Sequence, residues 1–201
     1  MKKGFGLSNG HSIYVFATGG VAPPIQKAAK QFQEKCGIRI DFTIGKAERL
    51  ISEIREKKVG DILSCGAEHV MDEAETLGLI RKESRKSVGK RRSVILVQAG
   101  NPKRIKSLKD LAKEGTKVGI SISGCLVGVW DDVCSKADLT DQIRKNITDF
   151  ADGCGAVMAL INQKKVDAIF GWNVFKNIWP GTSEIVELPK EIQVSEARGW
   201  Q

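Results

Sequence analysis

The sequence predicts an α/β fold in which mainly parallel strands are flanked by helices. The first observation is a strand–loop–helix pattern that occurs three times in roughly the first eighty residues. The second is a further series of strand and helix patterns that begins near residue 93. The third is that the loops between strands and helices are short and rich in small residues. Strands that alternate with helices in this way indicate parallel sheets covered by helices.

The first half of the chain supplies the three repeats. An apolar run at 13–17 predicts a buried strand, and the helix after it has an apolar face that runs from Ile25 to Phe32. Two more strands are expected at 38–42 and 61–66, each followed by a helix. The basic segment 81–92 contains no aromatic residue, and we interpret it as a solvated connector.

The second half predicts a similar set of elements. Ser107 followed by Asp110 resembles a capping box, which predicts the start of a short helix. Further helices are expected after two glycine-bearing loops. The expected strands lie at 93–97, 118–122, 147–150, 166–171 and 185–188.

Composition limits the classes of function. The chain has 201 residues and a formal net charge of +8, which favours anions and nucleic acid alike. The basic segment lacks the aromatic side chains on which bases stack, so we expect no nucleic-acid partner. No apolar run is long enough to span a bilayer, and the first residues lack the apolar core of a secretory signal.

Enzyme motifs are sparse in this sequence. It contains neither of the glycine-rich phosphate-binding fingerprints, no nucleophile elbow and no paired-histidine zinc motif. Neither His11 nor His69 has an obvious catalytic Ser or Cys partner nearby in the chain. We therefore expect a protein that is not an enzyme and needs no cofactor. The five cysteines form no CxxC motif, and their odd count argues against a fully paired disulfide framework.

Five loops are expected at the carboxyl ends of strands. In open α/β sheets, ligands bind beyond these ends, and the N-terminus of a helix suits an oxyanion because it presents unpaired N–H groups. The periodicity itself is equally compatible with a flavodoxin-like or Rossmann-like sheet. The loops lie at 18–20, 45–47, 65–66, 125–128 and 152–155.

The chain resembles the periplasmic molybdate/tungstate-binding proteins of ABC transporters from Ile13 to about Leu188. The stretch that carries the resemblance best is the strand at 94–97, followed by Asn101-Pro102 and the segment 107–111. The resemblance implies a type II periplasmic binding protein fold, with a ligand cleft between two lobes. It also implies that the family's last strand and helix are missing at the C-terminus. The implied division is a tail at 1–11, a first lobe at 12–88, a second lobe at 89–172 and a return segment at 173–201.

The resemblance also implies a function. Such a protein binds a small oxyanion such as molybdate or tungstate and delivers it, as a monomer, to an ABC transporter permease on the periplasmic or extracellular face of the membrane. The family usually presents serine in the first two loops, where this chain has Gly20 and Lys46-Ala47-Glu48. Lys46 would replace one hydroxyl with a charge-assisted bond. The backbone N–H donors are implied near Val127 and Gly153. The expected ligand-binding residues are Thr18, Gly19, Gly20, Lys46, Ala47, Cys65, Cys125, Val127, Gly153, Cys154 and Trp172.

Two alternatives use the same fold. Cys65, Cys125 and Cys154 lie in or beside the predicted ligand loops, and thiols near helix N-termini bind soft ions readily. These three thiols would then hold a thiophilic metal or metalloid. In the second alternative, the chain is a ligand sensor that acts on a regulator and takes no part in transport.

Overall fold

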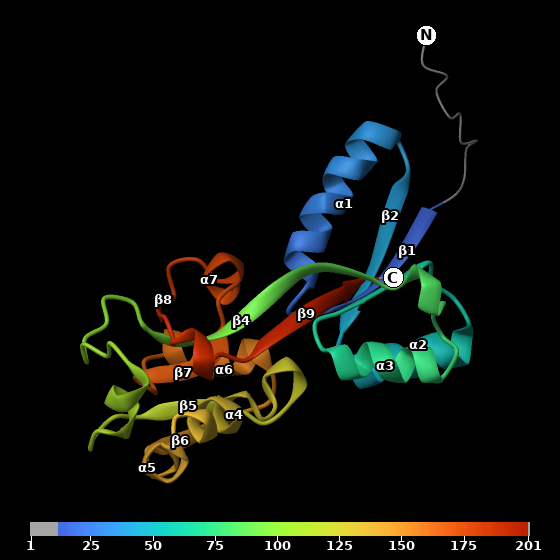
Figure 1. The fold of residues 1–201 in the computed structure, drawn as a ribbon. Helices are drawn as coiled ribbons and strands as arrows, with labels where there is room; N and C mark the ends of the chain where they lie inside the picture. The colour runs from blue at the N-terminus through green and yellow to red at the C-terminus, as the bar shows by residue number, and fades with distance from the viewer. Residues whose placement is uncertain (1–11, 201) are drawn as a thin grey trace.

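The computed structural model describes residues 12–200, which form two lobes connected by two crossing strands (Figure 1). The expected tail at 1–11, including His11, lies outside the described residues. The strand order is β2-β1-β3-β9-β4-β7-β5-β6, and β8 pairs with β4. Helices flank the sheets in both lobes, which confirms the predicted α/β class.

The first lobe contains the three predicted strand–helix repeats. Its strands β1, β2 and β3 are parallel, with β1 in the middle. Phe16, Leu50 and Met71 are buried together in a core beneath the helices. The elements are β1 (Ser12–Thr18), α1 (Ala22–Cys36), β2 (Arg39–Gly45), α2 (Ala47–Lys57), β3 (Ile62–Cys65) and α3 (Glu68–Thr76).

Helix α1 differs from its prediction. Only Ala22 and Ile25 of this helix are buried, and Phe32 is 41% exposed. The helix packs against β2, which is the edge strand of the sheet. An edge strand covers only part of a helix, so the expected apolar face is buried at its N-terminal end alone.

The second lobe holds the largest core, which includes Ile95, Val133 and Trp172. Strand β5 is parallel to β6 and β7, whereas β4 is antiparallel to β7 and β8. The predicted capping box of Ser107 and Asp110 is present at the start of η2. The elements are η2 (Leu108–Ala112), β5 (Val118–Ser121), η3 (Gly124–Leu126), α4 (Val129–Lys136), α5 (Thr140–Arg144), β6 (Ile147–Ala151), α6 (Cys154–Asn162), β7 (Ala168–Trp172), α7 (Phe175–Ile178), β8 (Ser183–Val186) and η4 (Lys190–Ile192).

Two strands, β4 (Lys86–Gln98) and β9 (Ser195–Trp200), connect the lobes. Strand β4 pairs with β9 up to Arg92, and from Ser93 onward it pairs with β7. Strand β9 also pairs with β3, so the backbone passes twice between the two sheets. Strand β4 therefore passes from the sheet of the first lobe to the sheet of the second lobe between Arg92 and Ser93. The lobe boundaries expected from the sequence remain a prediction.

The interpretation of segment 81–92 as a solvated connector holds in part, because most of its residues are exposed and it leads from one lobe to the other, but residues 86–92 belong to a strand and Arg91 is buried. After the short helix η1 (Lys82–Ser84), the chain enters β4, where β9 provides a hydrogen-bonding partner. Backbone pairing with β9 outweighs the low strand preference of the Lys and Arg residues in this segment. The side chain of Arg85 turns back to α3 and forms ion pairs with Glu68 and Asp72.

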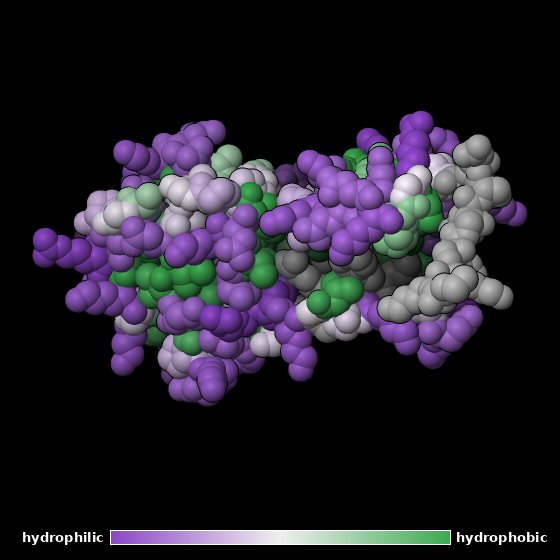
Figure 2. All heavy atoms as spheres, turned by 90° about the horizontal axis from the view of Figure 1, so that it is seen from above, coloured by the Kyte–Doolittle hydropathy of each residue, from purple (hydrophilic) through white to green (hydrophobic). Residues whose placement is uncertain are grey.

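Hydrophilic residues cover most of the face seen in Figure 2, with smaller apolar areas between them. Among the charged residues, Arg92 forms an ion pair in which its guanidinium contacts the carboxylate of Glu187 at 2.7 Å. No helix within residues 12–200 is both long enough and apolar enough to cross a membrane.

Candidate ligand-binding site

A cavity of about 860 Å³ lies where the two lobes meet. The loops after β1, β2 and β3 line it from the first lobe, and the loops after β5 and β6 line it from the second. All five loops follow the carboxyl ends of parallel strands, where ligands bind in open α/β sheets. The cavity therefore forms where the sequence pattern predicted a ligand site.

Ten of the eleven predicted site residues lie on the wall of this cavity. They are Thr18, Gly19, Gly20, Lys46, Ala47, Cys65, Cys125, Val127, Gly153 and Cys154. The eleventh, Trp172, is fully buried behind the wall, where its indole Nε1 donates a hydrogen bond to the carbonyl oxygen of Cys125 at 3.2 Å. In this structure Trp172 therefore supports the loop that carries Cys125 from the side away from the cavity. The contacts of all eleven residues with a ligand remain a prediction.

Several helices begin at the cavity. No side-chain hydrogen bond caps the N-terminus of α1, α2, α3 or α6 within the part of the chain that the structure describes. The first N–H groups of a helix have no partner inside it and carry partial positive charge, which attracts anions. Pro23 and Pro24 remove two of these donors from α1. The backbone donors therefore come chiefly from α2, α3 and α6.

The two backbone donors implied by the family resemblance are already engaged. The Gly153 N–H donates to Ser121 Oγ at 3.2 Å, and the Val127 N–H donates to the carbonyl oxygen of Gly124 at 3.3 Å. Both bonds shape the loops and leave these N–H groups committed within the protein. On the second lobe, the remaining backbone donors are those of the first turn of α6, which begins at Cys154.

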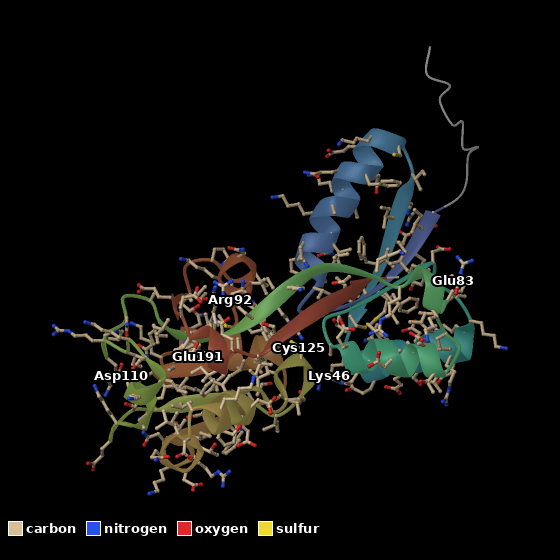
Figure 3. All side chains as sticks on the ribbon, in the orientation of Figure 1. Lys46, Glu83, Arg92, Asp110, Cys125 and Glu191 are labelled. Carbon is tan, nitrogen blue, oxygen red and sulfur yellow. The ribbon has the colours of Figure 1, made fainter. Side chains whose placement is uncertain are left out.

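Lys46 reaches across the cavity to the other lobe. Its Nζ donates to Asp152 Oδ2 at 2.6 Å, and Ser123 Oγ donates to the same carboxylate. The bond to Lys46, followed by the bond to Ser123, lowers the pKa of Asp152. The bond to Asp152 in turn raises the pKa of Lys46. Figure 3 shows Lys46 at the junction of the lobes, close to the loop that carries Cys125. A bound anion would have to share or replace the contact between Lys46 and Asp152.

Arg91 is a cavity residue that the sequence interpretation missed. It comes from the crossing strand β4, is only 2% exposed, and stacks its guanidinium over Trp172 at 4.1 Å from the ring centre. A buried guanidinium beside a cavity supplies a fixed positive charge, because arginine stays protonated. The available signal was strand alternation, which places Arg91 on the same face as Ser93 and Ile95.

Two cysteines meet at the wall of the cavity. The Sγ atoms of Cys125 and Cys154 are 2.9 Å apart, and Trp172 Nε1 lies 3.3 Å from the Cys125 sulfur. The hydrogen bond from Cys154, with the charge of Arg91, lowers the pKa of Cys125 to about 6. The same contact and burial raise the pKa of Cys154. The contact therefore favours a thiolate on Cys125 and a thiol on Cys154.

The three-thiol metal site is not formed. Cys65 is buried on β3 of the first lobe, and burial raises the pKa of its thiol to about 12. The other two cysteines, Cys125 and Cys154, belong to the second lobe. Within residues 12–200, no three His, Cys, Asp or Glu side chains are grouped so that they could hold a metal ion.

The wall of the cavity combines charge with apolar surface. Glu48 and His69 line the first-lobe side, while Ile122, Val127 and Trp179 add apolar area on the second. Ile122 and Val127 are largely exposed. A space of this size and mixed character can accept more than a bare tetrahedral anion.

Comparison with known proteins identifies the relatives of this chain. The family model described as "Bacterial extracellular solute-binding protein" matches residues 13–198. The molybdate-binding protein ModA of Mycobacterium tuberculosis (strain H37Rv) is 24% identical over 154 residues, a match that covers 70% of this chain and 59% of that relative. The chain thus spans less than two thirds of the relative's length.

Solved structures show the same fold. PEB3, a Campylobacter jejuni protein, superimposes with a TM-score of 0.81 in its L-phospholactate complex, at 24% identity, over 94% of this chain and 85% of PEB3. The periplasmic molybdate-binding protein of Azotobacter vinelandii superimposes with a TM-score of 0.73, at 15% identity, over 94% of this chain and 84% of that protein. At these identities the likeness concerns the fold.

Proposed function

The chain belongs to the bacterial extracellular solute-binding protein family, and on that premise we propose that it binds a small anion in the cavity between its lobes. One observation carries the proposal. The uncapped N-termini of α2, α3 and α6 converge on the cavity that Lys46 and Arg91 line. Backbone N–H groups and two cationic side chains together favour a negatively charged ligand.

Molybdate or tungstate is the first candidate for the anion. The relation to ModA supports it, and the cationic groups of the cavity suit a dianion. Lys46 stands where the family usually presents a hydroxyl, so selectivity here depends more on charge than on hydroxyl donors.

A small organic anion is the second candidate. The cavity of about 860 Å³ lies in the size range of sites for small organic molecules, and Ile122 and Val127 give part of its wall apolar character. The similarity in fold to PEB3, whose structure contains L-phospholactate, supports testing an organic phosphate.

In this proposal the loaded protein delivers its anion to the permease of an ABC transporter, on the periplasmic or extracellular face of the membrane, and acts as a monomer. The role is binding and not catalysis, because the relatives named above include binding proteins and the Asp152 carboxylate is held by Lys46. A sensor domain would bind the same anion and would differ only in its protein partner.

A ligand panel tests the proposal. Thermal unfolding would be followed with molybdate, tungstate, sulfate, phosphate or L-phospholactate, with sodium chloride at equal ionic strength as the control. An anion that binds the folded state and is present at about 100 times its Kd stabilises the protein by roughly 2.7 kcal/mol. We expect at least one anion to raise the unfolding temperature above the chloride control. No shift with any of the five would overturn the proposal.

A further inference from the structure

The thiol pair of Cys125 and Cys154 has a geometry that the binding of an anion does not require. The two residues are 29 positions apart in the chain, on η3 and at the start of α6, yet their sulfurs are in contact. Both side chains are partly exposed on the wall of the cavity. A small reagent in the cavity can therefore reach the pair.

The other cysteines within residues 12–200 differ from this pair. Cys65 and Cys134 are buried, and burial raises the pKa of each thiol to about 12. Cys36 is exposed at the end of α1. Only the Cys125–Cys154 pair combines a partner sulfur in contact, access from the cavity and a stabilised thiolate. The thiolate is the reactive form of cysteine, so exchange chemistry is directed to Cys125.

We propose that Cys125 and Cys154 form a redox-active pair that low-molecular-weight disulfides convert into a disulfide in the wall of the anion cavity. The Cys125 thiolate attacks one sulfur of the reagent RSSR and expels RS⁻, which leaves a mixed disulfide on Cys125. Cys154 loses its proton and attacks Cys125 Sγ, and this step expels a second RS⁻. The protein gives up two electrons and the proton of Cys154, and the reagent is reduced to one RSH and one RS⁻, which takes its proton from water.

Oxidation changes the charge of the cavity. In the reduced pair, the contact with Cys154 favours a thiolate on Cys125, and a thiolate on the cavity wall opposes an anion in the same space. The disulfide carries no charge, so oxidation removes this repulsion toward a bound anion. This consequence rests on the proposed anion binding. We expect the oxidised protein to bind its anion more tightly, on the order of tenfold. The reason is that a thiolate and an anion in the same partly buried cavity repel each other appreciably.

The test uses the whole chain, reduced and then treated with oxidised glutathione. The treated protein would be digested without reduction and analysed by mass spectrometry. We expect a cross-linked peptide pair that contains Cys125 and Cys154, also in the Cys36→Ser control. In Cys154→Ser the resolving thiol is absent, so a glutathione adduct should accumulate on Cys125. Absence of the cross-link in the wild type, or preferential reaction at Cys36, would overturn the proposal.

Affinity measurements distinguish the proposed anion binding from the proposed redox chemistry of the cysteine pair. Titration of the reduced and oxidised forms with the anion that gives the largest shift in the ligand panel should show tighter binding after oxidation. Equal affinities would overturn the charge effect. If no anion binds either form, the proposal of anion binding is overturned. The presence or absence of the Cys125–Cys154 cross-link still tests the redox proposal in that case.

Discussion

The buried guanidinium of Arg91 concentrates much of the chemistry of the cavity in one residue. It lines the cavity, stacks on Trp172, and lowers the pKa of Cys125 through its charge. A buried charge of this kind is costly unless its surroundings compensate for it, which makes the position sensitive to substitution. Its neighbour Arg92 lies on the same strand and forms an ion pair with Glu187.

Replacing Arg91 should weaken anion binding. We expect Arg91→Met to lower the affinity by about 10- to 100-fold, because a hydrogen bond to a charged group contributes roughly 1.5–3 kcal/mol. The same variant should raise the pKa of Cys125, measured as the pH dependence of its reaction with a thiol reagent. Calorimetric titration measures the affinity. Arg92→Met is the matched control, and equal losses in the two variants would contradict a specific role for Arg91.

The sequence predicted the cavity loops better than it predicted the charges around them. A strand that ends in small residues before a helix is a local signal, so the loops at Thr18 and Gly153 could be placed from the sequence. Strand alternation could place Arg91 on the face of Ser93 and Ile95 but not beside the cavity, because its position there depends on β9, a segment more than 100 residues away that no periodicity revealed. The contact between Lys46 and Asp152 likewise depends on how the two lobes meet.

At the scale of single elements, the short helix η2 begins at a capping box that satisfies several backbone donors. The Asp110 carboxylate accepts from the N–H groups of Lys106 and Ser107, both at 2.9 Å, and contacts Lys113 at 2.6 Å. The bond to Lys113, followed by the backbone bond, lowers the pKa of Asp110. The lowered pKa makes the stabilisation dependent on pH.

Removing the negative charge of Asp110 should destabilise the protein at neutral pH. We expect Asp110→Asn to lower the free energy of unfolding by about 1 kcal/mol, the usual loss for a helix cap. The folded pKa lies below the unfolded value of about 3.9, so the stabilisation is present above that pH and is lost as the pH falls. Urea unfolding at neutral and acidic pH measures the difference, which should shrink in acid.

Asp141→Asn provides the comparison for this measurement. Asp141 lies at the start of α5, and its side chain is 88% exposed. Exposed substitutions of this kind usually change stability by no more than about 0.5 kcal/mol. A loss in Asp110→Asn that is no larger than the loss in Asp141→Asn would refute the capping role.

Elements with strong local signals were predictable, and short or distant ones were not. Strands such as β1 and β5 are apolar runs, and α2 has the spacing of an amphipathic helix. Helices α5 and α7 have five and four residues, too few turns to show a period. Strand β9 is polar, and it is stabilised by pairing with β3 and β4, which a local pattern does not reveal.

On the scale of the whole molecule, the ion pair of Lys46 and Asp152 spans the cavity from one lobe to the other. Both side chains are largely exposed, so solvent and salt screen the attraction between them. The pair therefore stabilises a closed arrangement of the lobes only modestly, and a ligand can take its place.

Breaking the pair should open the cavity. We expect Lys46→Met to have a larger radius of gyration than the wild type in small-angle X-ray scattering at low salt, without ligand. The difference should diminish at high salt, where the wild-type pair is screened. Lys57→Met is the control, because it removes a Lys57–Glu53 pair within α2, in one lobe. Identical scattering from Lys46→Met and the wild type would show that the pair does not hold the lobes together.

The crossing strands have a consequence for biosynthesis. The sheet of the second lobe draws its strands from a continuous stretch between Ser93 and Val186. The sheet of the first lobe must wait for β9, which is translated after the other strands that the structure describes. The strands β1 to β3 are thus translated first, but their sheet is completed only after the sheet of the second lobe. Until β9 pairs with it, β3 has an unpaired edge. During synthesis that edge is open to pairing with another chain.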